Sequence, residues 1–226
     1  LSNTTNNRNI VIGGNWINNV GSAGFTAGTG TVTFSGSSTQ TLGGSGSTTF
    51  KNLTLNNAAG INQTVSSTIT GVLTFTSGVI TTGSSTVIIS STGSVTRTSG
   101  HINGNEQRNI ATGSSVSRTF DIGDATNYTP VTILFATVSV AGNITARSTN
   151  TDHPSLPSST LNGSLSVNRY WTLTNSGTTF TNYSATFNFV AGDKDASLNT
   201  SNLLVGNYNA SWAYPTVGTK TSTSTQ

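Results

Sequence analysis

Short stretches of alternating apolar and polar residues, separated by Gly, Ser and Asn, run through the first hundred residues. The segment GVLTFTSGVITTGSSTVIIS, residues 71–90, is an example, because Leu73 and Phe75 flank Thr74 and two more aliphatic pairs follow Ser/Gly steps. Alternation with a period of two is typical of β-strands, and Gly/Ser steps are typical of sharp corners. The pattern therefore predicts short strands connected by tight turns.

One strand pattern recurs at a nearly constant interval. Apolar-x-apolar triplets begin at Ile10, Val32, Leu53 and Leu73, and a weaker triplet begins at Val95, so the spacings are 22, 21, 20 and 22 residues. A β-solenoid requires such a period, because each coil visits two or three faces before it stacks on the next. We predict a β-solenoid with parallel β-helix-like coils of about 20 residues over residues 1–103.

The amino-acid composition is consistent with stacked coils. Thr, Ser and Asn make up 103 of the 226 residues, and charged residues make up 7%. Stacked strands lie about 4.8 Å apart, where repeated charges repel each other and hydroxyl or amide groups can form hydrogen bonds. Since Thr suits both a strand and a solvent-facing wall, we expect outward or corner positions for Thr31, Thr33, Thr54, Thr68, Thr70, Thr74 and Thr76.

The pattern changes after about His101. All four prolines lie beyond it, and twelve of the seventeen aromatic residues lie from Phe120 onward. Strand-like segments at this spacing predict an antiparallel β-sandwich over residues 104–215, followed by a polar tail or linker, 216–226. The expected strands are Arg118–Ile122, Val131–Val140, Ile144–Ser148, Ser164–Leu173, Thr179–Val190 and Leu203–Tyr208. The expected core aromatic residues are Trp171, Phe187, Phe189 and Trp212.

Several classes of protein do not fit this chain. It has no Cys and no Met, so disulfides and thiol chemistry are excluded. It has no apolar signal-peptide core and no run of 18 apolar residues, which predicts a processed or excised chain without a membrane span, secreted or at the cell surface. The net charge of +3 comes from nine scattered cations, so we expect no nucleic-acid binding.

Catalysis on the predicted solenoid is also disfavoured. Glycosidases and lyases use paired carboxylates or acid-held calcium, whereas residues 1–100 contain no Asp or Glu. We predict that the protein is not an enzyme, with no catalytic, cofactor-binding or metal-binding residues and no cofactor. The acids are expected in turns of the second domain: Glu106, Asp121, Asp124, Asp152, Asp193 and Asp195.

Three local patterns keep chemical alternatives open. Asp193 and Asp195, with Ser197 and Asn199, have the alternate spacing of a calcium loop but lack its Gly and Glu, so the sequence does not decide between calcium and an Asp-rich turn. Asp152 and His153 are adjacent and point opposite ways in an extended chain, which indicates loop polarity rather than acid–base work. His101 is expected to mark the interdomain turn.

Aromatic and threonine residues suggest two kinds of ligand. Trp171, Trp212 and Tyr214 could stack on sugars; the alternating strand around Trp171 favours burial, and Trp212 could equally be buried or exposed. Ice binding would need aligned Thr-x-Thr ranks. Such pairs do not keep one register along the chain, which disfavours ice binding; they are 31/33, 39/41, 68/70 and 74/76.

The repeats resemble a known group of proteins. The segments GGNW, GTVTFSGSSTQTL, FKNLTLNNAAG and GVLTFTSGVITTGSSTVII are similar to solenoid-type repeats of large secreted surface proteins of Bacteroidota. FDIGDATNYTPVTILF, NRYWTLTNSG and NLLVGNYNASW are similar to the β-sandwich module that often follows those repeats. The resemblance covers about residues 9–212. It implies export across the outer membrane and an adhesive or structural role at the surface, usually without a defined catalytic site.

The function we expect from the sequence follows from the end of the coil stack. A solenoid leaves unpaired backbone groups at each end, and LSNTTNNRNIVI contains no amphipathic helix or charged strand to cap them. We therefore expect an extracellular structural or adhesive protein, a self-assembling surface filament subunit that acts by head-to-tail β-contacts with copies of itself. The alternative is a carbohydrate-binding adhesin stalk module of a larger secreted protein, with surface glycans as partners.

Overall fold

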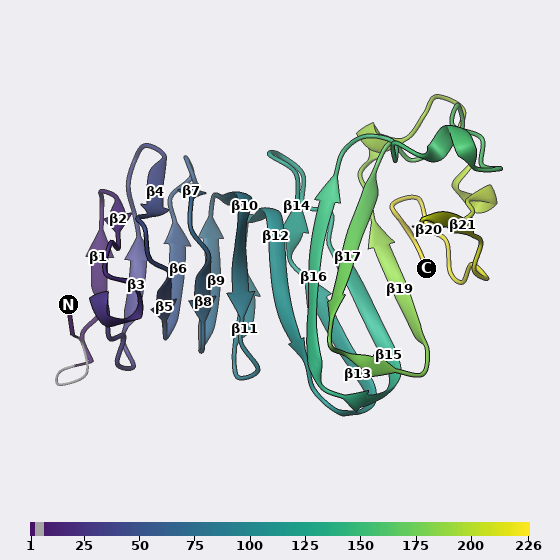
Figure 1. Cartoon of the computed structure of the whole chain (residues 1–226). Helices are drawn as coiled ribbons and strands as arrows, with labels where there is room; N and C mark the ends of the chain where they lie inside the picture. Colours follow the sequence, from purple (N-terminus) through teal and green to yellow (C-terminus); the bar gives the residue numbers. More distant parts are fainter. Residues whose placement is uncertain (3–6) are drawn as a thin grey trace.

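Five parallel strands stack in the register that the spacing predicts (Figure 1). The structure is a computed structural model, and it describes residues 1–2 and 7–226. The residues that begin the repeated triplets pair in sequence, from Ile10 with Val32 to Leu73 with Val95. The predicted β-solenoid is therefore confirmed. Its first wall consists of β1 (Ile10–Ile12), β3 (Thr31–Phe34), β6 (Asn52–Asn56), β9 (Val72–Ser77) and β11 (Ser94–Arg97).

A second wall faces the first across the interior. Its parallel strands are β2 (Trp16–Ile17), β4 (Gln40–Gly43), β7 (Ile61–Gln63), β10 (Val79–Ile89) and β12 (His101–Ile110). Alongside them, β5 (Thr48–Phe50) pairs with β8 (Ser67–Ile69), and β8 pairs with β10. The last parallel strand, β14 (Ile122–Gly123), pairs with β12, so the solenoid extends over residues 10–123.

Each wall separates apolar from hydroxyl side chains, as the alternation predicts. In the first wall Leu53, Leu73 and Phe75 have no exposed surface. Between them, Thr54 pairs with Thr74, and the hydroxyl of Thr96 donates to that of Thr74 at 3.1 Å. None of the seven threonines expected on the outside or at corners is buried. The threonine-rich composition is therefore that of a solvent-facing wall.

Asparagine side chains connect one coil to the next. The Asn9 Oδ1 atom accepts a hydrogen bond from the amide of Thr31 at 2.9 Å. Asn52 accepts from the amide of Val72 at 3.0 Å and donates from Nδ2 to the Thr29 carbonyl at 3.1 Å. These side chains satisfy backbone groups that the short strands leave unpaired at their ends.

Some corners between the walls require glycine. Gly78, between β9 and β10, has φ +93°, and a Cβ atom there would collide with the carbonyl oxygen of Asn57 in the preceding coil. Gly100 repeats this arrangement one coil later, against the carbonyl of Gly78. Glycine thus lets the chain turn while the coils remain at strand spacing.

Beyond the coils the chain forms antiparallel strands that share the same interior (Figure 1). The second wall continues through β12 into β16 (Gly142–Thr149) and β17 (Tyr170–Ser176). A facing sheet contains β13 (Gly113–Phe120), β15 (Val131–Val140), β18 (Thr179–Phe180), β19 (Tyr183–Asn188) and β22 (Ser224–Thr225). A separate hairpin pairs β20 (Asn207–Asn209) with β21 (Ser211–Ala213).

Helical structure in the described part of the chain is limited to short 3-10 turns. They are η1 (Gly21–Gly24), η2 (Leu156–Ser158), η3 (Ala191–Asp193) and η4 (Thr200–Asn202). Over the same residues, no helix has the length and apolar character needed to cross a membrane. The all-β prediction is confirmed.

The second half departs from the expected strands in four places. The expected strand at Ser164–Leu173 begins only at Tyr170, because the segment before it binds the turn around Asp195 through side chains. The expected strand at Leu203–Tyr208 is mostly irregular, and only its last two residues belong to β20. Two other expected strands are divided: Arg118–Ile122 into β13 and β14 at Asp121, and Thr179–Val190 into β18 and β19, which ends at Asn188.

The predicted domain limits fall inside paired structure. The boundary between residues 103 and 104 lies within β12, whose start pairs with β14 in parallel and whose end pairs with β16 in an antiparallel manner. Residues 216–226, expected as a polar tail or linker, return to the sandwich. There β22 pairs with β19, and Thr225 is buried. Backbone pairing therefore orders a segment with little apolar character.

The four aromatic residues expected in the sandwich core occupy different environments. Phe189 is buried, while Trp171 and Phe187 are half-buried with ring centres 5.0 Å apart. Trp212 lies outside the core, in the β20–β21 hairpin. Its place in the core was therefore wrongly predicted, because this hairpin packs against the sandwich from outside.

Candidate functional site

Charged side chains enter the interior where the coils end. Along the coils, inward positions of successive strands hold apolar or small polar residues. At the last coil, charged residues take their places. The strand register gives three such pairs: Phe75 with Arg97, Ile89 with Arg108, and Val87 with Glu106. Of these charged residues Glu106 is buried and Arg108 half-buried, whereas Arg97 is exposed.

Glu106 has no exposed surface and lies between a guanidinium group and a backbone amide. Its Oε1 atom accepts from Arg108 Nε at 2.6 Å, and its Oε2 atom accepts from the amide of Asp121. Arg108 also donates to Asp121 Oδ2 at 2.7 Å. Burial raises the pKa of Glu106 to about 7, although Arg108 opposes this shift.

A tyrosine connects this pair to the other arginine. The Tyr128 hydroxyl donates to Asp121 Oδ1 at 2.7 Å, and the Arg97 guanidinium lies 3.7 Å from the centre of the Tyr128 ring. Burial and the nearby Asp121 carboxylate raise the pKa of Tyr128 above its ordinary value. The arginine that ends the first wall is thus held by a cation–π contact.

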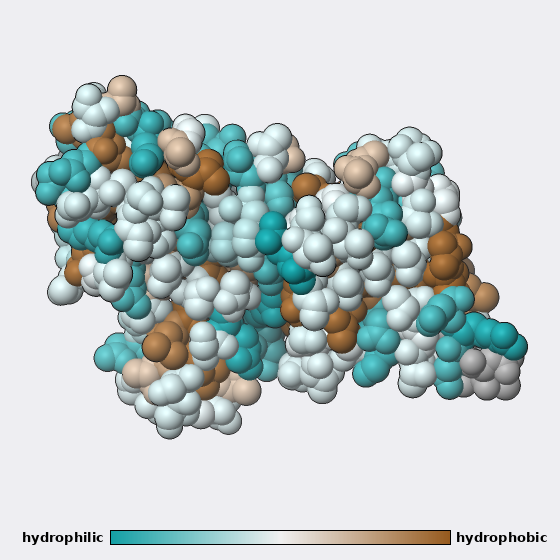
Figure 2. Space-filling model, turned by 180° about the vertical axis from the view of Figure 1, so that it is seen from behind, coloured by the Kyte–Doolittle hydropathy of each residue, from teal (hydrophilic) through white to brown (hydrophobic). Residues whose placement is uncertain are grey.

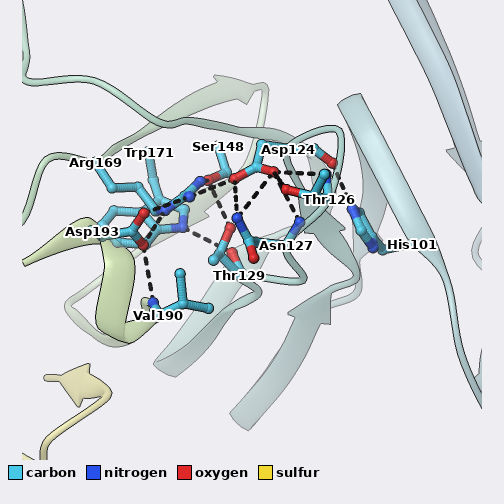
Figure 3. A network of polar contacts seen from close by, with 10 residues as sticks. All are labelled: His101, Asp124, Thr126, Asn127, Thr129, Ser148, Arg169, Trp171, Val190 and Asp193. Carbon is cyan, nitrogen blue, oxygen red and sulfur yellow. Dashed lines mark hydrogen bonds and ion pairs between the residues drawn. The ribbon is translucent and has the colours of Figure 1, made fainter.

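A second buried cluster surrounds Arg169, just before β17 (Figure 3). Its side chain has no exposed surface and donates to Asp124 at 2.6 Å, to both oxygens of Asp193 at 2.8 and 2.9 Å, and to Ser148 Oγ at 2.8 Å. Burial alone would lower the pKa of Arg169, but bonds with Asp193 and Asp124 raise it. This guanidinium therefore connects three segments distant in sequence.

Asp124 organises the turn after β14. Its Oδ1 atom accepts from the amides of Thr126 and Asn127 at 2.8 and 2.9 Å, and its carbonyl oxygen lies 2.7 Å from His101 Nε2 (Figure 3). Burial alone would raise the pKa of Asp124, but bonds from Thr126 and Arg169 hold it well below its ordinary value. Burial lowers the pKa of His101.

These clusters join the coils to the sandwich. Glu106 and the side chain of Arg169 are enclosed by protein, and their polar atoms have protein partners. Glu106 lies in β12, so the prediction of a turn was wrong for this acid. His101 also lies in β12, buried, and not in a turn.

The Asp193 and Asp195 side chains have separate sets of donors. Asp193 binds Arg169, whereas the Asp195 oxygens accept from the Ser166 amide at 2.8 Å and from Asn168 Nδ2 at 2.9 Å. Among the residues described, no three His, Asp or Glu side chains form a group that could hold a metal ion. The geometry supports the alternative of an Asp-rich turn.

Aromatic side chains gather around His153, on the C-terminal part of the chain. The His153 ring lies 4.9–5.4 Å from those of Tyr170, Tyr208 and Trp212. The indole of Trp212 donates to the Ser155 carbonyl at 3.1 Å and also contacts Tyr208. Of the predicted sugar-stacking residues, Trp171 and Trp212 are half-buried and Tyr214 is exposed.

A large cavity lies between β17 and β19, in the antiparallel part of the molecule. It has a volume of about 1540 Å³. Inward side chains of both strands line it, including Trp171 and Leu173 from β17 and Tyr183 and Phe187 from β19. Loops from residues 152–167 and 197–218 form the rest of its wall.

Large apolar side chains are exposed in two parts of the molecule, the first coil and the sandwich with its loops. The first coil carries Leu1, Val11, Ile17 and Val20, which are 55–71% exposed. No large apolar side chain of residues 21–133 is exposed to this degree. The others belong to the sandwich and its loops: Leu134, Val140, Leu165, Tyr183, Leu204, Tyr208 and Tyr214. Figure 2 shows brown side chains at the end where the chain begins, over the opposite half and, in smaller areas, between them.

Comparison with known proteins identifies no relative: no protein family, no curated protein and no solved structure matches this chain significantly. The fold is nevertheless clear, a β-solenoid of about five turns followed by antiparallel sheets. The similarity to surface proteins of Bacteroidota stays a prediction.

Sequence reasoning did not find Arg169 or the cleft between β17 and β19. The weak triplet at Val95, which has Arg97 where earlier coils have Phe or Leu, was the signal that the coil interior ends there. Arg169 had no comparable signal, because Asp124 and Asp193 lie 45 and 24 residues from it.

Proposed function

We propose that this protein is an extracellular structural or adhesive protein, a surface filament subunit that assembles through head-to-tail β-contacts. The observation that carries this proposal is the distribution of exposed apolar side chains, which lie on the first coil and the sandwich region but not on the coils between them. Scattered apolar residues are normal on a monomer, whereas gathered ones mark contact surfaces. Two different surfaces at opposite ends favour an open chain of subunits over a closed dimer.

The coils between the ends suit a rod. Successive windings share backbone hydrogen bonds, asparagine bridges and one apolar interior. Residues 1–100 contain three cations and no acid, so the coil surface offers little to charged ligands. The similarity of these repeats to those of secreted surface proteins of Bacteroidota supports an extracellular location.

Concentration-dependent assembly tests the proposal. The 226-residue chain should form linear oligomers or filaments in negative-stain electron microscopy, and its weight-average mass in sedimentation velocity should rise with concentration. A chain that stays monomeric at millimolar concentration would contradict the filament function.

The carbohydrate-binding stalk remains a second candidate, favoured by one observation. Tyr208 and Tyr214 are exposed beside Trp212 and the cleft, and aromatic rings bind sugars by stacking. Glycan-array and calorimetric signals that disappear in Tyr208→Ala but persist in Tyr183→Ala would support this candidate. No sugar-dependent signal for the parent would exclude it.

A further inference from the structure

The two ends of the molecule share one structural feature. At each end, two sheet edges flank an apolar interior (Figure 1). We call the outer edges of β1 and β2 the coil face, and the edges of β17 and β19, with the cleft between them, the cleft face. Because edges with unpaired backbone groups pair readily with other strands, each face is suited to β-contact with another chain.

The coil face leaves two strands with one partner each. Among the described strands, β1 pairs only with β3, and β2 pairs only with β4. Between these edges Ile10, Ile12 and Trp16 pack on the core but are only half-buried. A further layer of strands and apolar side chains would complete their burial.

The cleft face, at the other end of the molecule, also has strands with a free edge and inward side chains that are not fully buried. Within the described part of the chain, β17 pairs only with β16, and β19 has a second neighbour, β22, only at Phe187 and Asn188. The inward side chains Leu173 and Tyr183 remain half-buried and exposed, respectively, although their neighbours on inner strands are buried. No described strand lies beyond β17, and beside β19 lies only the C-terminal segment 223–226, while loops from residues 152–167 and 197–218 line the cleft between the two strands.

One sheet runs through the whole molecule between these faces. Its strand order is β17-β16-β12-β10-β7-β4-β2, so β2 and β17 are its two edges. If β2 of one copy lies beside β17 of the next, this sheet continues from subunit to subunit. The facing wall then brings β1 beside β19, since facing sheets in both regions are separated by the usual distance of about 10 Å.

We propose that the occupant of the cleft face is the coil face of a second copy of this chain. This inference rests on the proposed filament function and names the strands that form its contact: β2 against β17 and β1 against β19. Charge agrees with it, because residues 1–100, which include the coil face, contain no acid, while the cleft contains Asp152, which has no ion-pair partner among the described residues. A coil face against a cleft face is heterologous and repeats into a fibre.

Two single substitutions test the contact separately. Ile17→Lys places a charge on the coil face, where Ile17 is 55% exposed, and Tyr183→Lys places one on the cleft face, where Tyr183 is 46% exposed. Leu134→Lys is the matched control: Leu134 is an exposed apolar residue of the sandwich (43%), but it points to the outer side of β15, while its neighbours Ile133 and Phe135 line the cleft. Circular dichroism and thermal unfolding establish that each variant is folded.

Mixing the two variants gives the decisive result. Each variant alone should remain monomeric at concentrations where the parent and Leu134→Lys assemble, whereas an equimolar mixture should form dimers, because one intact coil face can meet one intact cleft face. If the parent assembles and either variant still forms filaments, or if the mixture stays monomeric, the named contact is wrong while the filament function stands. A parent that never assembles removes both proposals.

Discussion

The coils and the region that follows them solve the same packing problem with different chemistry. In the coils, equivalent positions of successive windings pair directly, so Leu53 lies beside Leu73 and Thr54 beside Thr74. A charge that repeated in such a rank would meet its own copy at strand spacing. Beyond β11 the repetition ends, and buried charges occur in compensated groups such as Glu106 with Arg108 and Arg169 with two aspartates.

This difference explains why the first hundred residues contain so few charged side chains. The coils have few charged residues because equivalent positions of successive coils stack directly on one another. Their outer surface is in contact with solvent, so shielding from water is not the reason. The junction accepts charge because each position occurs once and can have its own partner. Three experiments can break or sharpen this comparison, from the largest expected effect to the smallest.

The first removes the guanidinium of the larger cluster. Arg169→Met should lower the free energy of unfolding by about 4 kcal/mol, because Asp124 and Asp193 then remain buried without their cation. Denaturant unfolding followed by tryptophan fluorescence measures this loss. The exposed Arg147→Met provides the control and should change stability by less than about 0.5 kcal/mol. Equal small effects of both substitutions would show that the cluster does not hold the junction.

The second concerns the pH dependence of the smaller cluster. The pKa of Glu106 is about 7 in the folded protein and 4.5 as its ordinary value, so the folded state binds its proton more tightly than the unfolded state. The stabilisation is present below pH 4.5 and is lost as the pH rises through 7. The free energy of unfolding of the parent, relative to Glu106→Gln, should therefore fall by up to about 3 kcal/mol over this window.

Comparison with the variant isolates this group from its neighbours. Burial lowers the pKa of His101, whose contribution is lost as the pH falls below 6.5, but both proteins share it. Unfolding curves at half-unit intervals between pH 4 and 8 would provide the difference. A parent-to-variant difference independent of pH would contradict the assignment.

The third introduces charges into the repeated wall. Thr54→Lys with Thr74→Lys should be about 1 kcal/mol less stable than Thr54→Lys with Thr74→Glu, because the two positions pair directly on adjacent strands. Both variants carry two new charges on the outer face, so only the sign differs. Thermal unfolding at low and high salt measures the gap, which should shrink as salt screens the pair. Equal stability at low salt would argue against direct stacking as the reason for the missing charges.

Much of the fold was predictable because its signals are local or periodic. Alternation defined the strands of the coils, and the recurrence of Ile10, Val32, Leu53, Leu73 and Val95 gave their register before any pairing was known. The limits of β15 were also predicted from its alternation. Threonine ranks were harder: Thr33, Thr54, Thr74 and Thr96 form one rank, whereas the search for Thr-x-Thr pairs found no common register.

The candidate site was not predictable in the same way. The cleft lies between β17 and β19, which belong to different sheets, so it depends on how the sheets pack rather than on either strand. Trp212 was displaced from the core for a similar reason: it pairs with Tyr208 in the β20–β21 hairpin and packs against His153 from a distant loop.

The sequence alone determined that this chain is β-structured, that its first half winds in coils of about 21 residues, and which side chains face inward. Those properties follow from patterns that repeat along the chain. Only the tertiary structure decided which charges meet and where the cleft lies. A pairing between Arg169 and carboxylates 24 and 45 residues away leaves no period in the sequence, because it occurs once and depends on the path of the whole chain.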